Sequence, residues 1–210
     1  MILGVTGFIG SGKDTIADYL CTMHGFKRIS FAGSLKDAVA SIFNWDRELL
    51  EGTTKSSRVW RDTVDEWWSQ RLNIPHLTPR WVLQNWGTEV CRNGFHQDIW
   101  VASVEHKLQT AKDNIVITDC RFKNEIDAIK NAKGITCRVE RGPRPEWYDD
   151  ASNLVKGPSQ IGWAIAKDRL KHFNVHASEY SSVGLDYDFY IDNNGSIDEL
   201  HKQIDSIINL

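Results

Sequence analysis

The 210-residue sequence lacks the features of several protein classes. Its formal net charge is only −3, so there is no electrostatic case for a protein that coats DNA, and no direct nucleic-acid partner is expected. No apolar run approaches the roughly 20 residues needed to span a bilayer, so no membrane partner is expected either. An apolar stretch follows Met1 directly and leaves no room for a signal peptide. These absences predict a cytoplasmic protein.

Cysteine is scarce, and the four cysteines lie far apart in the chain. They form neither a Cys-x-x-Cys pair nor a zinc-binding spacing, so we expect reduced thiols. The sequence shows no internal repeat and no low-complexity tail. Its length and its hydrophobic content of 41% predict a single domain over residues 1–210.

The strongest motif lies in the first 20 residues. Residues 2–5 are a short apolar run, typical of a buried parallel strand. The next stretch has the spacing Gly7-x-x-x-x-Gly12-Lys13, and a helical pattern follows it. An ordinary glycine turn between strand and helix is the alternative interpretation. The order of strand, glycine loop, lysine and helix favours a phosphate-binding P-loop.

Each residue type in this loop suits a phosphate chain. Glycines let the backbone curl tightly, so that several N–H groups point at one anion, and the helix N-terminus adds its unpaired N–H groups. Lys13 supplies a mobile positive charge. Asp14 stands where Ser or Thr usually serves magnesium, so we expect Thr15 to contact the phosphates, with magnesium held partly through water. The predicted phosphate-binding residues are Gly10, Ser11, Gly12, Lys13, Asp14 and Thr15.

The next segments are predicted from periodicity. Residues 27–32 are expected to form a second strand, and Gly33 and Ser34 to begin a helix with a core-facing side. Its expected inward residues are Leu35, Ala38, Val39, Ile42 and Phe43. Residues 44–79 match no motif and are expected to be an insert on the substrate side, with a helix over about 58–72. Tryptophans in that helix could hold a base, but packing against the core is the favoured interpretation.

A second informative stretch runs from Thr78 to Arg92. Thr78 is expected to cap a helix with Pro79 at its first position. At about 100° per residue one side is apolar and the other is polar. The apolar side is expected to hold Val82, Leu83, Trp86 and Val90, and the polar side Arg80, Gln84, Thr88 and Arg92. Gly87 weakens a helix interior by about 1 kcal/mol relative to Ala, which indicates a close approach. We interpret this side as a site for a second phosphate and its base; an ordinary amphipathic helix is the alternative.

Residues 114–119 read as a buried strand that ends in a carboxylate, Asp119. Ligands of open α/β sheets bind at the carboxyl ends of strands, and in P-loop proteins an acid at this place serves magnesium and its waters. Arg121 follows at the start of a helix, where it can reach phosphate. The pattern of apolar strand, Asp, one residue and Arg therefore supports the P-loop interpretation.

The C-terminal half continues the alternation of strands and helices. A strand is expected over 134–141 and another over 188–193, with a helix after Ser196. Residues 142–182 are expected to form a lid, whose helix around 161–173 is rich in Lys and Arg; a solvated basic helix is the alternative. His172 and His176 make a poor metal site. The predicted class is α/β, with a mostly parallel sheet of about five strands flanked by helices, and with helical lid and insert segments.

Taken together, these motifs resemble those of the deoxynucleoside monophosphate kinases of tailed bacteriophages. They occur in the same order and cover nearly the whole chain, and Asp after the P-loop lysine is usual in that family. The Gln-x-x-Gly-Thr stretch with its downstream Phe and Trp is the most specific of them. The matching positions are Lys13-Asp14-Thr15-x-Ala17-Asp18; Leu83-Gln84-x-x-Gly87-Thr88 with Asn93, Phe95, Trp100 and Val101; Asp119-x-Arg121-x-x-x-Glu125-x-Asp127; Val139-x-Arg141; His176-x-x-Glu179; and Ile191-x-Asn193-x-Gly195-Ser196-x-x-Glu199-Leu200.

The resemblance implies a P-loop kinase core that transfers the γ-phosphoryl group of ATP, with Mg²⁺, to a deoxynucleoside monophosphate. The implied partners are small nucleotides, a second copy of the chain is left open, and a phage-encoded protein would act in the host cytoplasm. The implied catalytic residues are Lys13, Arg92, Asp119 and Arg121, and the implied metal residues are Asp119 and Thr15. The implied acceptor-binding residues are Arg80, Gln84, Gly87, Thr88, Arg92, Trp100, Glu125 and Glu179. Arg141 and Asn193 are implied to lie near adenine or the lid.

Two alternatives remain at this stage. The first is another small-molecule P-loop kinase, such as one acting on dephospho-coenzyme A or on a nucleoside; such kinases lack the Gln-x-x-Gly-Thr helix. The second is a nucleotide-binding accessory protein without transferase activity, against which the intact lysine, Asp119 and the arginines stand.

Overall fold

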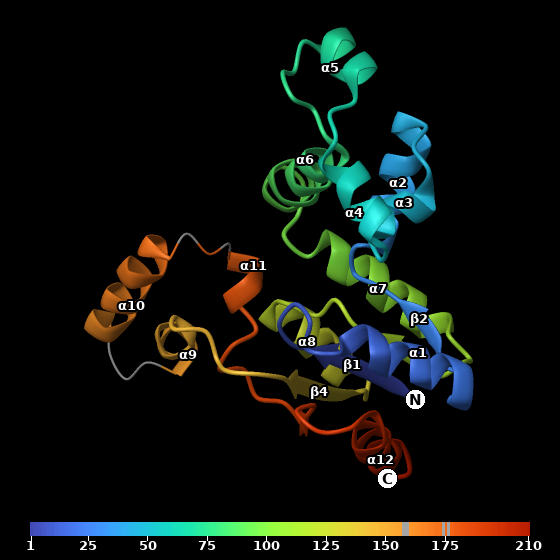
Figure 1. Ribbon diagram of the computed structural model, residues 1–210, viewed down its shortest axis with the longest axis vertical. Coiled ribbons are helices and arrows are strands. Elements are labelled where there is room, and N and C mark those ends of the chain that lie inside the picture. Colours follow the sequence, from blue (N-terminus) through green and yellow to red (C-terminus); the bar gives the residue numbers. More distant parts are fainter. Residues whose placement is uncertain (157–159, 174, 176) are drawn as a thin grey trace. The chain divides into compact units, whose positions relative to one another are not determined.

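The computed structural model describes residues 1–156, 160–173, 175 and 177–210 (Figure 1). The chain forms two compact units, each described by itself. The sheet unit comprises Met1–Ser30 and Lys107–Leu210, and the helical unit comprises Phe31–His106. The prediction that residues 1–210 form one functional domain remains a prediction.

The sheet unit is built on five strands in the order β2-β3-β1-β4-β5, and every neighbouring pair is parallel. The strands are β1 (Ile2–Thr6), β2 (Lys27–Ile29), β3 (Ile115–Ile117), β4 (Ile135–Glu140) and β5 (Phe189–Asp192). This arrangement confirms the predicted α/β class and the five-stranded parallel sheet. The second strand ends at Ile29, earlier than expected.

β1 lies at the centre of the sheet, hydrogen-bonded to β3 on one side and β4 on the other. From β1 the chain passes to β2 and β3 on one side, and then to β4 and β5 on the other. The carboxyl end of β1 is therefore the topological switch point, where parallel sheets bind their ligands. The loop that carries the phosphate-binding motif follows β1 directly.

Helices cover both faces of this sheet. On one face α1 (Lys13–His24) and α12 (Ile197–Ile208) pack against β1 and β4. The shared core is apolar and buried, and it includes Leu3, Val5, Ile16, Leu20, Cys137, Val139, Leu200 and Ile204. On the other face, α8 (Lys123–Asn131) brings Ile129 so close to Gly4 that a Cβ atom at Gly4 would clash with it. Close packing of α8 explains why the central strand contains a glycine.

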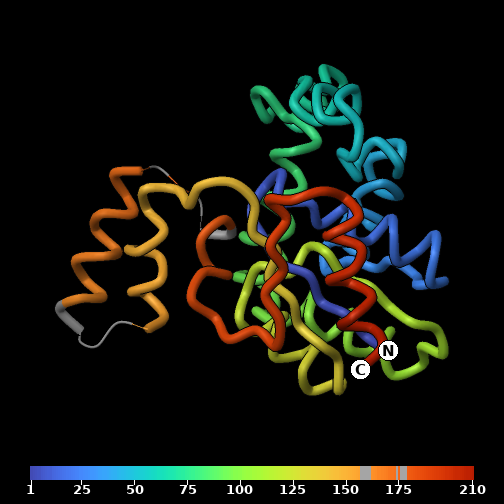
Figure 2. Tube along the Cα trace, turned by 60° about the horizontal axis from the view of Figure 1, so that its bottom comes forward, coloured from blue at the N-terminus to red at the C-terminus, as the bar shows by residue number. Residues whose placement is uncertain are grey.

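Between β4 and β5, the described residues form three helices, and the interpretation of this segment as a lid remains a prediction. They are α9 (Tyr148–Lys156), α10 (Gln160–His172) and α11 (Ala177–Tyr180). Only α10 was expected. Figure 2 shows α9 and α10 side by side, and their small core is formed by Ala151 and Leu170 with Val183. His176, which was expected to match a family motif, lies outside the described residues.

The helical unit packs around a core that is rich in tryptophan. Trp45 is buried with Leu50 and Val82, and Trp60, Trp68, Trp86 and Trp100 pack against this core. The interpretation of most of these tryptophans as packing residues is confirmed, whereas Trp67 is 62% exposed. The helices are α2 (Gly33–Phe43), α3 (Arg47–Glu51), α4 (Lys55–Asp62), α5 (Glu66–Leu72), α6 (Pro79–Gln84), η1 (Asn85–Asn93) and α7 (Ile99–Thr110), whose last residues belong to the sheet unit.

Two predictions for this unit are wrong. The helix expected over 58–72 is broken at residues 63–65, because the Asp65 carboxylate accepts a hydrogen bond from the Trp68 N–H and starts a new helix. The inward side of α2 is narrower than expected, since Leu35, Val39 and Phe43 are buried whereas Ala38 and Ile42 are exposed.

The helix expected over Thr78–Arg92 begins as predicted and then changes its geometry. Thr78 caps it through the Trp81 N–H, and Pro79 occupies the first turn. Beyond Gln84 the chain forms a π-helix, η1, in which each turn contains more residues than in an α-helix. The rotation of about 100° per residue therefore fails there, and Val90 is 51% exposed instead of inward.

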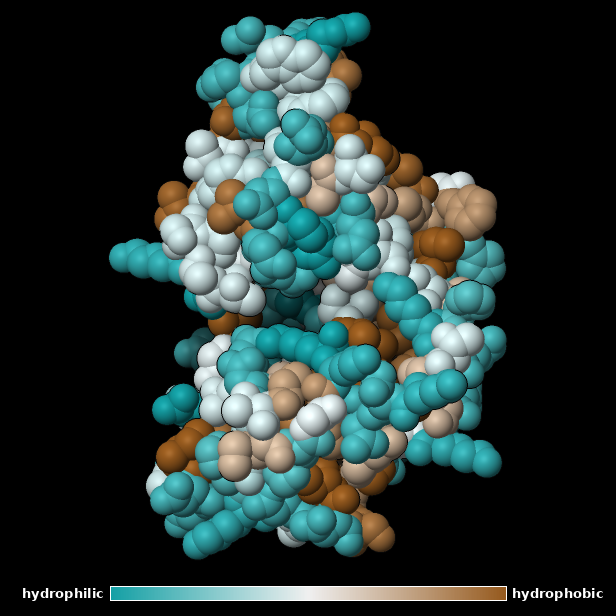
Figure 3. All heavy atoms as spheres, turned by 90° about the vertical axis from the view of Figure 1, so that its right-hand side faces the viewer, coloured by the Kyte–Doolittle hydropathy of each residue, from teal (hydrophilic) through white to brown (hydrophobic). Residues whose placement is uncertain are grey.

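Hydrophilic side chains cover most of the face shown in Figure 3, and hydrophobic ones occur there in small groups. Among the described residues, no helix is both long and apolar enough to cross a bilayer. Small exposed apolar groups of this kind are ordinary on protein surfaces.

The N-terminus of α12 provides a test of the fold. The Ser196 hydroxyl accepts a hydrogen bond from the Glu199 N–H, and the Glu199 carboxylate accepts one from the Ser196 N–H at 2.7 Å. Ser196→Ala should therefore lower the free energy of unfolding by about 1 kcal/mol. Urea denaturation measures this loss.

Ser206→Ala on the same helix is the matched control, because the Ser206 hydroxyl only donates to the Gln203 carbonyl. It should change stability by less than about 0.5 kcal/mol. Equal losses in the two variants would contradict the capping role of Ser196.

Candidate phosphate-binding site

The loop after β1 has the backbone geometry of a phosphate cradle. Gly10 and Gly12 have φ angles of 78° and 105°, values that residues with a side chain rarely adopt. The Ser11 N–H bonds to the Phe8 carbonyl at 3.1 Å and closes the turn. Gly12 is also the N-cap of α1, so the unpaired N–H groups of a 12-residue helix begin here.

A buried amide from the far edge of the sheet braces this loop. Asn193 follows β5, and its side-chain N–H donates to the Ser11 carbonyl at 2.8 Å. A Cβ atom at Gly12 would clash with the same amide group. Asn193, expected near adenine or the lid, is thus placed against the loop backbone, and it explains the glycine at position 12.

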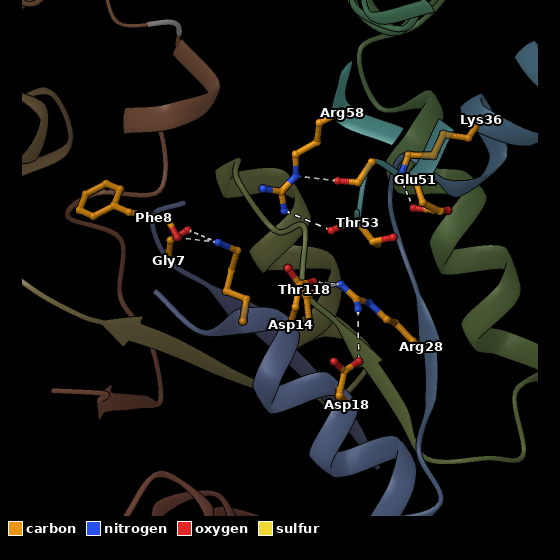
Figure 4. A network of polar contacts seen from close by, with 12 residues as sticks. Gly7, Phe8, Asp14, Asp18, Arg28, Lys36, Glu51, Thr53, Arg58 and Thr118 are labelled. Atoms are coloured by element: carbon orange, nitrogen blue, oxygen red, sulfur yellow. Dashed lines mark hydrogen bonds and ion pairs between the residues drawn. The ribbon is translucent and has the colours of Figure 1, made fainter. Parts of the chain in front are cut away.

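Lys13 points back over the loop. Its ammonium group donates to the carbonyls of Gly7 at 2.7 Å and Phe8 at 2.8 Å (Figure 4). Burial lowers the pKa of Lys13; the nearby Asp14 carboxylate opposes this shift and Arg121 adds to it. A lowered pKa means that the ammonium lacks full compensation for its lost hydration, so an anion at this place would stabilise the charge.

The loop fits a phosphate group. The Ser11 hydroxyl oxygen is buried, at a residue only 2% exposed, and it has no hydrogen-bond partner in the part of the chain that the structure describes. A buried hydroxyl of this kind is costly unless a ligand or water completes it. Together with Lys13 and the helix N-terminus, this hydroxyl fits the binding of an anion such as phosphate.

The two residues predicted to serve Mg²⁺ lie on, or just after, elements next to the central strand. Thr15 is on the first turn of α1, and Asp119 follows β3 next to Thr118. Among the described residues, no three or more His, Cys, Asp or Glu side chains gather as a metal site. Few protein ligands suit Mg²⁺, which keeps several waters and binds substrate phosphates.

Arg121 is positioned by two glutamates. Its guanidinium donates to Glu179 on α11 at 2.8 Å, and its backbone N–H donates to Glu125 at 2.8 Å. The Glu125 carboxylate is buried and also accepts the Phe122 N–H. The structure therefore brings three predicted residues into one group and places Glu125 and Glu179 as supports of Arg121.

Arg28 was missed by the sequence analysis. This residue of β2 contacts the Asp14 carboxylate and donates to the Thr118 hydroxyl at 2.8 Å (Figure 4). Its second terminal nitrogen lies 3.9 Å from Asp18. The sequence feature that could have revealed Arg28 is a charged side chain in the short strand that follows the motif and its helix.

Arg138 was also missed. It is only 1% exposed, donates to Glu140 and to the Ser182 carbonyl, and places its guanidinium carbon 5.0 Å from the centre of the Phe8 ring. Burial raises the pKa of the neighbouring Tyr187 to about 12, so its hydroxyl stays protonated. Since Phe8 belongs to the loop, Arg138 ties that loop to β4.

The residues expected to bind the acceptor lie mostly in the helical unit. The Nε and one terminal nitrogen of Arg80 donate to the two carboxylate oxygens of Asp62. The Trp100 indole N–H donates to the Gly87 carbonyl at 2.9 Å, and a Cβ atom at Gly87 would lie 2.9 Å from Leu35. The close approach that Gly87 indicated is therefore made by a neighbouring helix of the same unit.

The other predicted positions differ in exposure. Gln84 and Thr88 are exposed, and Arg92 is half-buried on η1. Because of the π-helix, these residues do not follow the expected i, i+4 spacing of one α-helical face. Arg141 is exposed just beyond β4.

The brace at Asn193 gives a testable expectation. Asn193→Ala leaves the buried Ser11 carbonyl without its partner, so the free energy of unfolding should fall by about 1–3 kcal/mol. Asn194→Ala is the matched control, because Asn194 is exposed and bonds only to the Gly142 N–H and to Asp192. Chemical denaturation compares the two variants, and equal losses would show that Asn193 does not brace the loop.

Comparison with known proteins places this chain in a family. A "Putative deoxynucleotide monophosphate kinase" of Acanthamoeba polyphaga mimivirus is 30% identical over 223 aligned residues, which cover 99% of this chain and 96% of the viral protein. No family model matches the sequence.

Solved structures were compared as well. A shikimate kinase from Aquifex aeolicus aligns over 100% of this chain and 96% of its own, with 13% identity and a TM-score of 0.46. A dephospho-CoA kinase from Campylobacter jejuni covers 99% and 95%, with 16% identity and a TM-score of 0.45. Both TM-scores are below 0.5, so no conclusion about this chain is based on these two similarities. On the strength of the viral relative and of the P-loop geometry, the chain belongs to the deoxynucleotide monophosphate kinase family.

Proposed function

We propose that this protein transfers the γ-phosphoryl group of ATP to a deoxynucleoside 5′-monophosphate, giving ADP and a deoxynucleoside diphosphate. The observation that carries the proposal is the glycine loop with the half-buried Lys13 at the N-terminus of α1. The viral relative, aligned over nearly the whole of both chains, supports the choice of a nucleotide as acceptor. The product lies on the route to the triphosphates used in DNA replication, as in the tailed-phage enzymes.

Phosphoryl transfer of this kind needs positioning and charge compensation more than covalent chemistry. Lys13 exchanges its two carbonyl contacts for oxygens of the ATP phosphates, while the loop N–H groups and the Ser11 hydroxyl hold the chain of phosphates. Arg121, held by Glu125 and Glu179, offsets charge on the group in transfer. No general base is needed, since the acceptor is already an ionised phosphate.

Magnesium would be held by Asp119 and Thr15, partly through water, and when bound it would offset charge on the ATP phosphates.

For the acceptor, we propose that Arg92 and Arg80 bind its phosphate, with Gln84 and Thr88 beside them. Arg80 would have to leave Asp62 to do so. Gly87 and Trp100 would shape the wall through the hydrogen bond that joins them.

The experiment that tests the proposal is a coupled assay of ADP release with ATP and Mg²⁺. The acceptors are dAMP, dGMP, dCMP, dTMP, AMP and GMP, each added separately. We expect ADP release to depend on an added monophosphate and to be faster with a deoxynucleotide than with its ribose counterpart. ADP release that ignores the acceptor, or no release with any of the six, would contradict the proposal.

Lys13→Ala should reduce the transfer rate at least about 1,000-fold, because the variant loses the charge that compensates the phosphates. Its circular dichroism should match that of the parent protein. Lys202→Ala, on α12, is the matched control and should keep the parent rate. A Lys13 variant that kept half of its activity would remove the P-loop from the mechanism.

A further inference from the structure

Asp14 was predicted among the phosphate-binding residues, but only its backbone N–H suits a phosphate, because its carboxylate is negatively charged. Its carboxylate follows Lys13 directly, on the first turn of the helix whose N-terminus faces the loop. An acidic residue there stabilises the helix dipole, but a bound polyphosphate needs the same positive end. Without compensation, the charge of Asp14 offsets that of Lys13 and weakens the attraction of the loop for an anion.

Arg28 supplies the compensation. One of its terminal nitrogens contacts Asp14, and the other lies 3.9 Å from Asp18, one turn further along α1 (Figure 4). The same guanidinium donates to Thr118, which is 5% exposed and precedes Asp119. Arg28 thus fixes the Asp14 carboxylate and offsets its charge beside Lys13.

The direction of the Arg28 side chain supports this role. In the sheet Arg28 lies opposite Val116, yet its guanidinium reaches Thr118, beyond the carboxyl end of β3. The neighbouring Lys27 points to the other end, where it pairs with Asp113 at 2.8 Å before β3 begins. Of two adjacent basic residues on β2, only Arg28 therefore serves the edge that holds the phosphate loop.

We propose that Arg28 is a positioning residue that sets the affinity of the loop for the phosphates of ATP by neutralising Asp14. The proposal rests on the ATP binding proposed above. Arg28 acts through Asp14 and has no need to touch the nucleotide. Its contribution is a charge effect, so it should be reversed by removing the charge of Asp14 and weakened by salt.

The test is isothermal titration calorimetry of the full chain with ATP. Arg28→Met should raise the Kd about tenfold at low ionic strength, because an uncompensated carboxylate then repels the phosphates. At about 0.5 M salt the difference should shrink to about twofold. Arg28→Met/Asp14→Asn should return the Kd to within about twofold of the parent value, since the repelling charge is gone.

Two controls separate this effect from a loss of helix stability. Asp14 and Asp18 are like charges four residues apart, so Arg28→Met also destabilises α1. Arg28→Met/Asp18→Asn relieves that repulsion but leaves the carboxylate beside the loop, so its Kd should stay raised. Lys27→Met removes a positive charge from the same strand at the other end and should leave the Kd unchanged.

The outcomes are distinct. A parent protein that does not bind ATP overturns the proposed function and this inference together. If the parent binds ATP and Arg28→Met binds equally well, only the role of Arg28 is overturned. Equal rescue by Asp18→Asn and Asp14→Asn would assign Arg28 to the stability of α1, as thermal unfolding of the same variants would show.

Discussion

The site depends on the position of β1 at the centre of a parallel sheet. Hydrogen bonds to β3 and β4 hold this strand on both sides, so its carboxyl end is fixed in place. The glycine loop starts from that end and is held from outside by Asn193 and by Arg138, which packs on the Phe8 ring, and Lys13 bonds back to two of its carbonyls. A loop whose N–H groups must all point at one anion needs such support. In a mobile loop, the entropy lost on ordering would reduce the free energy of binding.

Much of the sheet unit was predictable because its signals are local. A short apolar run, a glycine spacing and a capping serine each determine structure within a few residues, and the structure confirms β1, α1 and the start of α12. The helical unit was less predictable. The break at Asp65 and the π-helix after Gln84 depend on which groups form hydrogen bonds with each other. The hydrophobic periodicity of the sequence does not reveal this.

The residues of the candidate site were likewise predicted only in part. Lys13, Asp119 and Arg121 were predicted from motifs, whereas Arg28 and Arg138 were missed because each lies within a strand and acts on a loop that is distant in sequence. Glu125 illustrates a further limit. The sequence marked it as important, but only the structure shows that its carboxylate accepts the backbone N–H groups of Arg121 and Phe122, and that Glu179 accepts from the Arg121 guanidinium.

The π-helix η1 makes the length of its segment a constraint in its own right. The hydrogen bonds of such a helix join residues five apart, whereas those of an α-helix join residues four apart. Adding or removing a residue between Asn85 and Asn93 changes the number of residues between hydrogen-bond partners, so the winding of the segment has to change. Related sequences should therefore tolerate substitutions in this stretch more readily than changes in its number of residues.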